Sequence, residues 1–412
     1  MATETAADSV TETRDLRTGT PVWSSYASSR LTVEILRQAI RADVVVVGAG
    51  VTGALIAEAL SSRGLSTVVL DRRQPGHGST AASTALLQFE LDTPLIRLAD
   101  DIGFERASRV WRRSFKAIED LADLVRHLRI DCDFRERRAL YLAGNVLGAA
   151  ELAEEGRQRR AIGLPSTFLG ATELRDLAGF ERAAALLSSG AADVDPVRLT
   201  RGLLRRAMAR GVRLFSPVQL AEVAPSSRKV AMATADGVEL EAAAIVFATG
   251  YELADGVPSR GHRRTSTWAF ATRPQPSALW SQGELIWEAS KPYLYIRSTT
   301  DGRVVVGGED EDCDDEAARD ALLPRKTAAL QKKTSQLMPW LDVSAEYAWA
   351  GTFGESENGL PSIGRIPGMA NCYAVLGYGG NGLTFGVIAA QVMAGLFCQR
   401  NDPDASLFAF AS

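Results

Sequence analysis

Residues 43–53 read Asp43-Val-Val-Val-Val-Gly-Ala-Gly-Val-Thr-Gly53, an apolar run that leads directly into glycines spaced as GxGxxG. The run predicts a short buried parallel strand, and the Ala/Leu-rich segment after it predicts a helix that ends near Gly64. Residues 65–70 form a second apolar run that stops at Asp71. Together these features predict a β-α-β unit of the kind that binds a dinucleotide.

Each motif residue has a physical role in that unit. Gly48 permits the tight turn from strand to helix, Gly50 lets the backbone approach a pyrophosphate, and Gly53 lets helix and strand pack closely. The start of the helix then stabilises the phosphate charge. Asp71 is placed to accept hydrogen bonds from a ribose diol. A glycine turn in another kind of α/β protein is the alternative, but such a turn would not need Asp71.

The composition is that of an ordinary globular protein. The 412 residues are 46% hydrophobic and 23% charged, which argues against disorder, a coiled coil and a membrane-spanning class, and the length favours two domains. A net charge of −4 gives no general attraction to nucleic acid. The four cysteines have no CxxC spacing and there are three histidines, so no metal site is expected.

The first 20 residues are polar and acidic and lack the pattern of a signal peptide, so we interpret them as a loose tail. No apolar run near the N-terminus approaches the roughly 20 residues that cross a bilayer. We therefore expect no membrane span and a cytoplasmic protein. The scattered cysteines fit a reducing compartment.

Later segments extend the fold. Apolar residues at helical spacing predict a helix over residues 101–128, and Asp195 before Pro196 predicts a capped helix start. Strands are expected at 212–218, 230–234, 238–241 and 244–248, and alternating strands between about 265 and 310 indicate an antiparallel sheet. Near the end, a strand at 373–376 leads through a glycine-rich turn into a helix at 383–397.

These elements predict an α/β plus α+β fold, in which a Rossmann-like cofactor-binding domain is interleaved with a substrate domain built on an antiparallel sheet. The expected boundaries are an N-terminal tail and lead-in at 1–40, a discontinuous cofactor domain at 41–90, 191–255 and 345–412, and a substrate domain at 91–190 and 256–344.

Three separated segments carry a family resemblance: Val44–Gly53 with Asp71, Ile245–Gly250, and Trp349–Gly364 followed by Gly377–Gly382. In combination they resemble the FAD-dependent amine and D-amino-acid oxidase superfamily. The pattern is most similar to the branch that contains γ-glutamylputrescine oxidase, glycine oxidase and sarcosine oxidase. The resemblance covers nearly everything after residue 40.

The resemblance implies that the cofactor is FAD and assigns its contacts. It places the glycine loop at the pyrophosphate, Asp71 at the adenosine ribose, Val218 at the adenine, and the turn at 379–384 beside the flavin pyrimidine. A helix start at that turn would stabilise the negative charge of the reduced flavin. The residues assigned to FAD are Gly48, Gly50, Val51, Thr52, Gly53, Asp71, Arg72, Arg73, Ser79, Thr80, Ala81, Ala82, Ser83, Val218, Thr249, Gly250, Gly379, Gly380, Asn381, Gly382, Leu383 and Thr384.

The sequence also departs from this family. Phe353 stands where amino-acid-oxidising relatives carry an arginine for the substrate carboxylate, so an α-amino acid is less favoured. Gly351 stands where sarcosine oxidases attach the flavin through a cysteine, so FAD is expected to bind non-covalently. The strand at 303–307 lacks the lysine that promotes oxygen reaction in sarcosine oxidases, so a dehydrogenase is left open beside an oxidase.

Four residues are candidates for the substrate pocket: Tyr295, Arg297, Gln88 and Phe353. Alternation puts Tyr293, Tyr295 and Arg297 on one face of a strand, where they form either a pocket wall with one cation or ordinary cross-strand packing. Glu90, which follows Gln88, would favour a cationic or polyamine-like substrate. The run Glu309–Glu316 lacks the spacing of a calcium loop and is interpreted as a solvated acidic loop.

The predicted reaction is oxidation of a C–N bond in an amine to an imine by hydride transfer to the flavin. The amine would be a secondary amine, a polyamine-like molecule or an amino-acid derivative, and oxygen or another acceptor, including a partner protein, would take the electrons. No acid–base residue is required, because the cofactor performs this step. An NAD(P)-linked dehydrogenase is an alternative that leaves Gly377–Gly382 unexplained. A flavoprotein subunit of a multi-subunit dehydrogenase is another.

Overall fold

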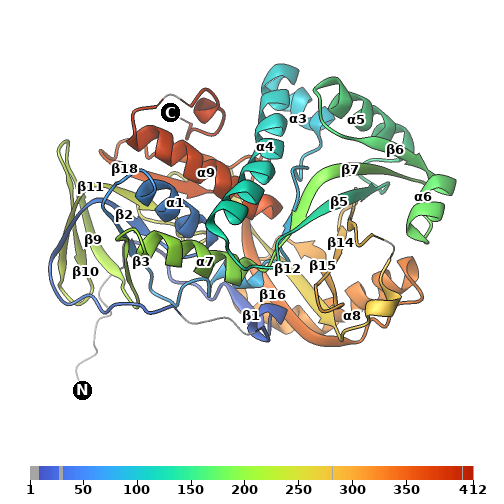
Figure 1. Cartoon of the computed structure of the whole chain (residues 1–412), viewed down its shortest axis with the longest axis horizontal. Coiled ribbons are helices and arrows are strands. Elements are labelled where there is room, and N and C mark those ends of the chain that lie inside the picture. Colours follow the sequence, from blue (N-terminus) through green and yellow to red (C-terminus); the bar gives the residue numbers. More distant parts are fainter. Residues whose placement is uncertain (1–8, 27–30, 281, 401, 412) are drawn as a thin grey trace.

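The computed structural model describes residues 9–26, 31–280, 282–400 and 402–411, and these form two β-sheets with helices around them (Figure 1). Residues 1–8 of the expected tail lie outside the described ranges.

The first sheet is built around the apolar run at residues 43–47. Strand β2 (Ile40–Val47) lies between β11 (Glu239–Phe247) and β3 (Thr67–Leu70), and the three run parallel. The strand order is β17-β18-β11-β2-β3-β8, with β10 paired to β11 and β9 to β10. The remaining strands are β8 (Arg213–Phe215), β9 (Leu220–Pro225), β10 (Val230–Thr234), β17 (Ser362–Arg365) and β18 (Cys372–Leu376).

Both faces of this sheet are buried, which explains its nearly continuous apolar strands. Val44 and Val46 pack on the face covered by helices α1 (Val51–Ser61), α7 (Pro196–Met208) and α9 (Gly382–Phe397), as Figure 1 shows. Val45 belongs to a separate core cluster on the opposite face.

The second sheet has the order β1-β16-β12-β15-β14-β13-β5-β7-β4, with β6 beside β7. Its pairs are antiparallel, apart from the parallel pair β13 and β5. The strands are β1 (Arg17–Gly19), β4 (Leu86–Leu87), β5 (Arg135–Leu142), β6 (Thr167–Gly170), β7 (Ala184–Asp193), β12 (His262–Thr272), β13 (Leu285–Glu288), β14 (Leu294–Ser298), β15 (Val304–Glu311) and β16 (Ala345–Ser356).

Side-chain alternation gives the second sheet two distinct faces. Trp268 and Phe270 point to helix α8 (Glu316–Leu337), whereas Ala269 and Trp349 join the core that this sheet shares with the first. The other helices are α2 (Ser79–Ala82), α3 (Leu95–Ile102), α4 (Phe104–Leu128), α5 (Ala149–Ala161) and α6 (Ala171–Ala178), with short 3-10 turns η1 (Val22–Ser24), η2 (Pro276–Ala278), η3 (Gly379–Asn381) and η4 (Ala405–Leu407).

The predicted fold class is confirmed. The helix cap is also confirmed, because Asp195 accepts hydrogen bonds from the backbone N–H groups of Val197 and Arg198, both at 2.9 Å. The helix predicted over 101–128 starts instead at Phe104, because Gly103 adopts φ +86° and separates it from α3.

Hydrogen bonding divides the chain differently from the predicted boundaries at three strands. Strands β16 and β4, expected in the cofactor domain, belong to the second sheet, and so does β1 from the expected tail. Strand β16 belongs to the second sheet because it pairs with β12 along residues His262–Thr272. The boundaries elsewhere stay a prediction.

The segment Gly379–Phe397 is long and apolar enough to cross a membrane by length and composition, with a mean hydropathy of 1.3. However, 67% of this window is buried inside the fold, as in the core helix of a soluble protein.

Candidate cofactor and substrate site

A large cavity lies between the carboxyl ends of β2 and β3 and the inner face of the second sheet, and it contains about 1810 Å³ of space, part of it open to solvent. It is lined at one end by Gly48, Gly50 and Asp71. The opposite end, which we call the far end, is lined by Tyr293 and Tyr295. The carboxyl ends of parallel strands are where ligands bind in open α/β sheets.

The glycine loop has the close contacts that its sequence predicts. A Cβ on Gly48, which has φ +110°, would lie 2.3 Å from the carbonyl oxygen of Ala248, and a Cβ on Gly53 would lie 1.8 Å from that of Gly48. A Cβ on Gly50 would instead meet the Thr80 hydroxyl at 3.1 Å on the cavity wall. Gly48 and Gly53 are therefore required for packing, whereas Gly50 keeps the backbone open to a ligand.

Two helices begin at this cavity, and neither N-cap residue supplies a side-chain hydrogen bond to its helix. These residues are Gly50 for α1, where the Thr80 hydroxyl accepts the N–H of Val51 at 3.0 Å, and Asn381 for α9. Both residues line the cavity. Their backbone N–H groups and positive dipole ends make these two positions suited to negative charge.

Asp71 is held in place by the backbone. Its carboxylate accepts the N–H groups of Ala49 and Arg73, both at 2.6 Å, and burial raises the pKa of Asp71 to about 6. Each oxygen keeps a further lone pair for a ribose hydroxyl. Nearby, the N–H of Val218 donates to the carbonyl of Asp71 at 2.8 Å.

Arg72 and Arg73 turn from the cavity wall toward the N-terminal segment. Arg73 binds Glu252 through two hydrogen bonds of 2.6 and 2.7 Å, and Arg72 donates to Thr13 at 2.5 Å and to Thr11. These two arginines connect the loop after β3 to residues 9–14.

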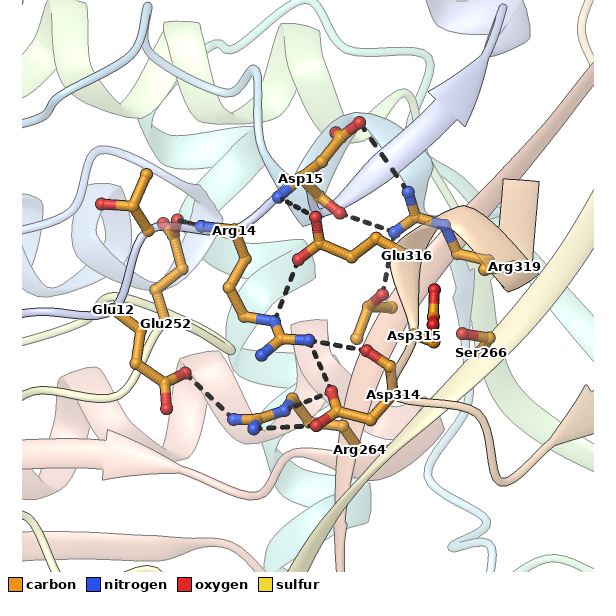
Figure 2. A network of polar contacts seen from close by, with 12 residues as sticks. Glu12, Arg14, Asp15, Glu252, Arg264, Ser266, Asp314, Asp315, Glu316 and Arg319 are labelled. Atoms are coloured by element: carbon orange, nitrogen blue, oxygen red, sulfur yellow. Dashed lines mark hydrogen bonds and ion pairs between the residues drawn. The ribbon is translucent and has the colours of Figure 1, made fainter. Parts of the chain in front are cut away.

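Residues 9–19 are not the loose tail expected from the sequence, because they lie against both sheets. Val10, Thr11 and Leu16 line the cavity. Figure 2 shows Arg14 and Arg264 converging on Asp314, with Arg14 Nη2 2.6 Å from its carboxylate. No local pattern predicts this position, because Arg14 and Asp314 are 300 residues apart in the chain.

Most residues assigned to FAD line this cavity; the exceptions are Gly53, Ala81 and Thr384. Gly53 serves packing, and Ala81 is buried. The Thr384 hydroxyl donates to the carbonyl of Gln88 at 2.9 Å and so ties helix α9 to the segment after β4. The indole N–H groups of Trp349 and Trp23 hold the carbonyls of Ala82 and Ser83 at 2.8 and 2.7 Å.

Three of the four pocket candidates, Tyr295, Gln88 and Phe353, line the far end of the cavity, but Arg297 does not. Arg297 is 2% exposed, and its guanidinium donates to the carbonyls of Thr84, Ala85 and Val194. Arg297 does lie on the same face of β14 as Tyr295, as side-chain alternation predicts. At Arg297, however, this face is covered by the backbone segments that contain Thr84, Ala85 and Val194. The prediction of a pocket cation at Arg297 is therefore wrong.

The interpretation of Glu309–Glu316 as a solvated loop is also wrong in its first half. Strand β15 continues to Glu311, and a bulge opposite Thr267 contains Glu309 at φ +60°. Glu309 is buried toward α8, where Lys326 lies 3.6 Å away, while Asp310 points to the inner face.

Sequence reasoning missed several residues at the far end. Asp92, Thr267, Tyr251 and Tyr378 line the cavity there beside the expected aromatic side chains and Trp287. Gln88, Glu90 and Asp92 are polar residues at every second position, and this spacing is the sequence pattern that could have identified Asp92. Glu90, for which the sequence suggested contact with a cationic substrate, also lines the cavity; it is 2% exposed, lies 3.7 Å from Arg159, and burial raises its pKa.

Similarity to known proteins identifies the family of this chain. The family described as FAD dependent oxidoreductase matches residues 43–396. The chain belongs to this family. It is an FAD-dependent oxidoreductase, and the residues at the glycine loop, Asp71 and the start of α9 fit that cofactor.

Individual proteins are similar over almost the whole length. Gamma-glutamylputrescine oxidoreductase of Escherichia coli (strain K12) is 24% identical over 401 residues, covering 93% of this chain and 91% of that protein. Glycine oxidase from Geobacillus kaustophilus superposes with a TM-score of 0.74 at 22% identity, covering 90% of this chain and 98% of that one. L-proline dehydrogenase from P. horikoshii gives 0.73 at 16% identity, covering 90% and 97%. The two structures confirm the fold.

Proposed function

We propose that this FAD-dependent oxidoreductase oxidises the C–N bond of an amine to the corresponding imine. The observation that carries this proposal is the far end of the cavity, where aromatic side chains and Asp92 gather. Among the described lining residues, the arginines are Arg72 and Arg73, both on the side of the N-terminal segment, and burial lowers the pKa of the one histidine, His77. Two of the similar proteins are named for an amine derivative and for an amino acid.

The proposed cofactor contacts follow from the lining. We assign the pyrophosphate to the start of α1, the ribose to Asp71, and the flavin ring to the start of α9. When bound, FAD supplies the acceptor for a hydride from the carbon next to the amine nitrogen. The backbone N–H groups at the start of α9 would stabilise negative charge there.

The tasks left to the protein are to admit a neutral amine, orient its C–H bond and exclude water. Tyr251, Tyr295, Phe353 and Tyr378 supply an apolar wall for this purpose. Phe353 lines the far end of the cavity, and Arg297 is bound to three backbone carbonyls. Among the described residues at the far end, therefore, no arginine is available to bind an α-carboxylate. We therefore propose an amine whose recognition does not depend on an α-carboxylate.

Electrons would then pass to oxygen or to another acceptor, and we propose the cytoplasm as the compartment. The free state of Cys132, Cys313, Cys372 and Cys398 supports a reducing environment.

The test is anaerobic bleaching of the purified flavoprotein with secondary amines, polyamines, γ-glutamyl amines and D-amino acids, followed by readmission of air. We expect rapid bleaching by an amine without an α-carboxylate. A preference for D-amino acids would contradict the substrate argument, and bleaching by none of these compounds would contradict the proposal. Slow recovery of colour in air would identify a dehydrogenase or a flavoprotein subunit that needs a partner.

A further inference from the structure

Asp92 presents a carboxylate directly to the cavity. One oxygen accepts the N–H of Gly380 at 2.7 Å, and the backbone N–H of Asp92 donates to Asn381 at 3.3 Å. A Cβ on Gly379 would lie 2.8 Å from this carboxylate, so it packs against the turn before α9. Asp92 lies deep in the fold, and its side chain lines the cavity, whose space is what leaves part of it uncovered. Its remaining lone pairs are available to a ligand.

Asp310 lies behind the opposite wall. Both of its carboxylate oxygens are buried and neither reaches full hydrogen-bond geometry, although the hydroxyls of Thr267 and Tyr293 are close enough to lower its pKa. The bulge at Glu309 brings it there, because one extra residue turns Asp310, rather than Glu309, to the inner face. Burying a charged carboxylate costs free energy, so the position of Asp310 calls for a functional explanation.

Tyr293 and Tyr295 line the same cavity as Asp92, and both acids are close enough to raise the pKa of each tyrosine; the ring centroids of this Tyr293–Tyr295 wall are 5.5 Å apart. The ring of Tyr295 lies on Gly307, where a Cβ would come within 2.3 Å of it, and its hydroxyl lies 3.3 Å from that of Thr267. An ionised carboxylate only accepts hydrogen bonds, so Asp310 attracts the hydroxyl hydrogens of Tyr293 and Thr267. The oxygen lone pairs of these hydroxyls are then left for the cavity.

The surrounding charges keep this end negative. The acidic Glu355 raises the pKa of both Asp92 and Asp310. Asp92 also raises the pKa of Asp310, and the exposed Lys291 lowers the pKa of Asp92. Burial raises the pKa of Asp92 to about 6 and that of Asp310 to about 7. Above these values both side chains are anionic and attract a cation.

We propose that the substrate carries a second, non-reacting ammonium group, which Asp92 binds against the Tyr293–Tyr295 wall. Asp310 is a positioning residue that acts through Tyr293 and Thr267. The substrate class is then a diamine, a polyamine or a derivative with one free distal ammonium. The inference rests on the proposed amine oxidation.

The chemistry explains why the charge would serve a distal nitrogen. The reacting nitrogen must be neutral for its neighbouring carbon to lose a hydride, and a carboxylate beside it would keep it protonated. A distal ammonium keeps its charge throughout, and aromatic faces with a carboxylate form a site for such a cation.

The first test uses the wild-type FAD-loaded protein and does not depend on turnover. (6-Hydroxyhexyl)trimethylammonium and its uncharged carbon isostere 7,7-dimethyloctan-1-ol are titrated while the flavin absorbance is followed, because neither contains an amine nitrogen with a lone pair that could be oxidised. We expect the cation to bind about 10- to 100-fold more tightly than its isostere, as for one cation held by a carboxylate and aromatic faces. Equal affinities would overturn the proposal.

The second test compares Asp92→Asn, Asp310→Asn and the control Asp312→Asn. An asparagine at 92 can still accept the N–H of Gly380, and Asp312 is exposed outside the cavity. Stopped-flow flavin reduction with 1,6-diaminohexane and with hexylamine separates the dissociation constant from the limiting reduction rate. We expect the affinity preference for the diamine to fall toward one in Asp92→Asn and Asp310→Asn, and to persist in Asp312→Asn.

The outcomes separate this inference from the proposed function. Reduction by neither amine would contradict amine oxidation itself, while the titration would still decide whether the cavity recognises a distal cation. A diamine preference that survives in both variants would overturn the inference alone. A loss confined to the reduction rate, equal for both amines, would make the acids proton acceptors and also overturn it.

Discussion

At the scale of single residues, the same backbone conformation serves different purposes at two glycines. Gly50 has φ −74° and ψ −176° at the N-cap of α1, and Gly148 has φ −75° and ψ −178° at the N-cap of α5. Gly50 lines the cavity, whereas Gly148 is not among its lining residues. The surroundings, and not the backbone dihedrals, give Gly50 its proposed role at the pyrophosphate.

We predict that Gly50→Val abolishes FAD binding. The new side chain would start 3.1 Å from the Thr80 hydroxyl and extend into the space proposed for the pyrophosphate. The measurement is the ratio of flavin to protein absorbance after purification and after incubation with excess FAD.

Gly148→Val is the matched control, because it makes the same change at the same dihedral angles outside the cavity. It should retain full flavin occupancy. Equal occupancy in both variants would contradict the assignment of the glycine loop.

At the scale of elements, the N-terminal segment, residues 9–19, lines one side of the cavity, where we propose that the adenine binds. It pairs with β16 through β1 and is fastened by Arg72, Arg73 and the network in Figure 2. A polar, acidic sequence of this kind resembles a loose tail because its partners, such as Glu252 and Asp314, are brought to it only by the folded sheets.

We predict that deleting residues 1–19 weakens FAD binding at least about tenfold, or ~1.4 kcal/mol. The deletion removes Val10, Thr11 and Leu16 from the cavity wall and leaves Arg72 without its hydroxyl partners. Dissociation of FAD, followed by the return of flavin fluorescence, measures the effect.

Deletion of residues 1–8 alone is the control for this experiment, and it should leave the dissociation rate unchanged. The same rate in the two deletion variants and the full chain would contradict a role for the segment in holding FAD.

At the scale of the whole molecule, the cavity is walled by both sheets, so a cofactor in it would connect them. The glycine loop and Asp71 come from the first sheet, and Phe353 and Tyr295 come from the second. A ligand that binds only the folded state stabilises it in proportion to the logarithm of its concentration.

We predict that the folded protein unfolds in one transition whose midpoint rises with added FAD, with about 2.7 kcal/mol of stabilisation at 100 times the dissociation constant. Differential scanning calorimetry over a series of FAD concentrations measures this shift. The Gly50→Val variant should show no shift. Two separate transitions, of which FAD moves only one, would contradict a bridging cofactor.

The sequence alone determined the β-α-β unit and its glycine positions, because strand, turn and helix signals lie within about 30 neighbouring residues and act through local backbone geometry. The FAD-binding family followed from three separated motifs taken together. It also identified Tyr295, Gln88 and Phe353 as residues that prove to line one cavity. Only the tertiary structure decided that Arg297 is buried against three carbonyls, that a bulge turns Asp310 inward, and that Asp92 lines the same cavity as Tyr293 and Tyr295. These outcomes depend on pairing and burial between segments far apart in the chain, which no local pattern encodes.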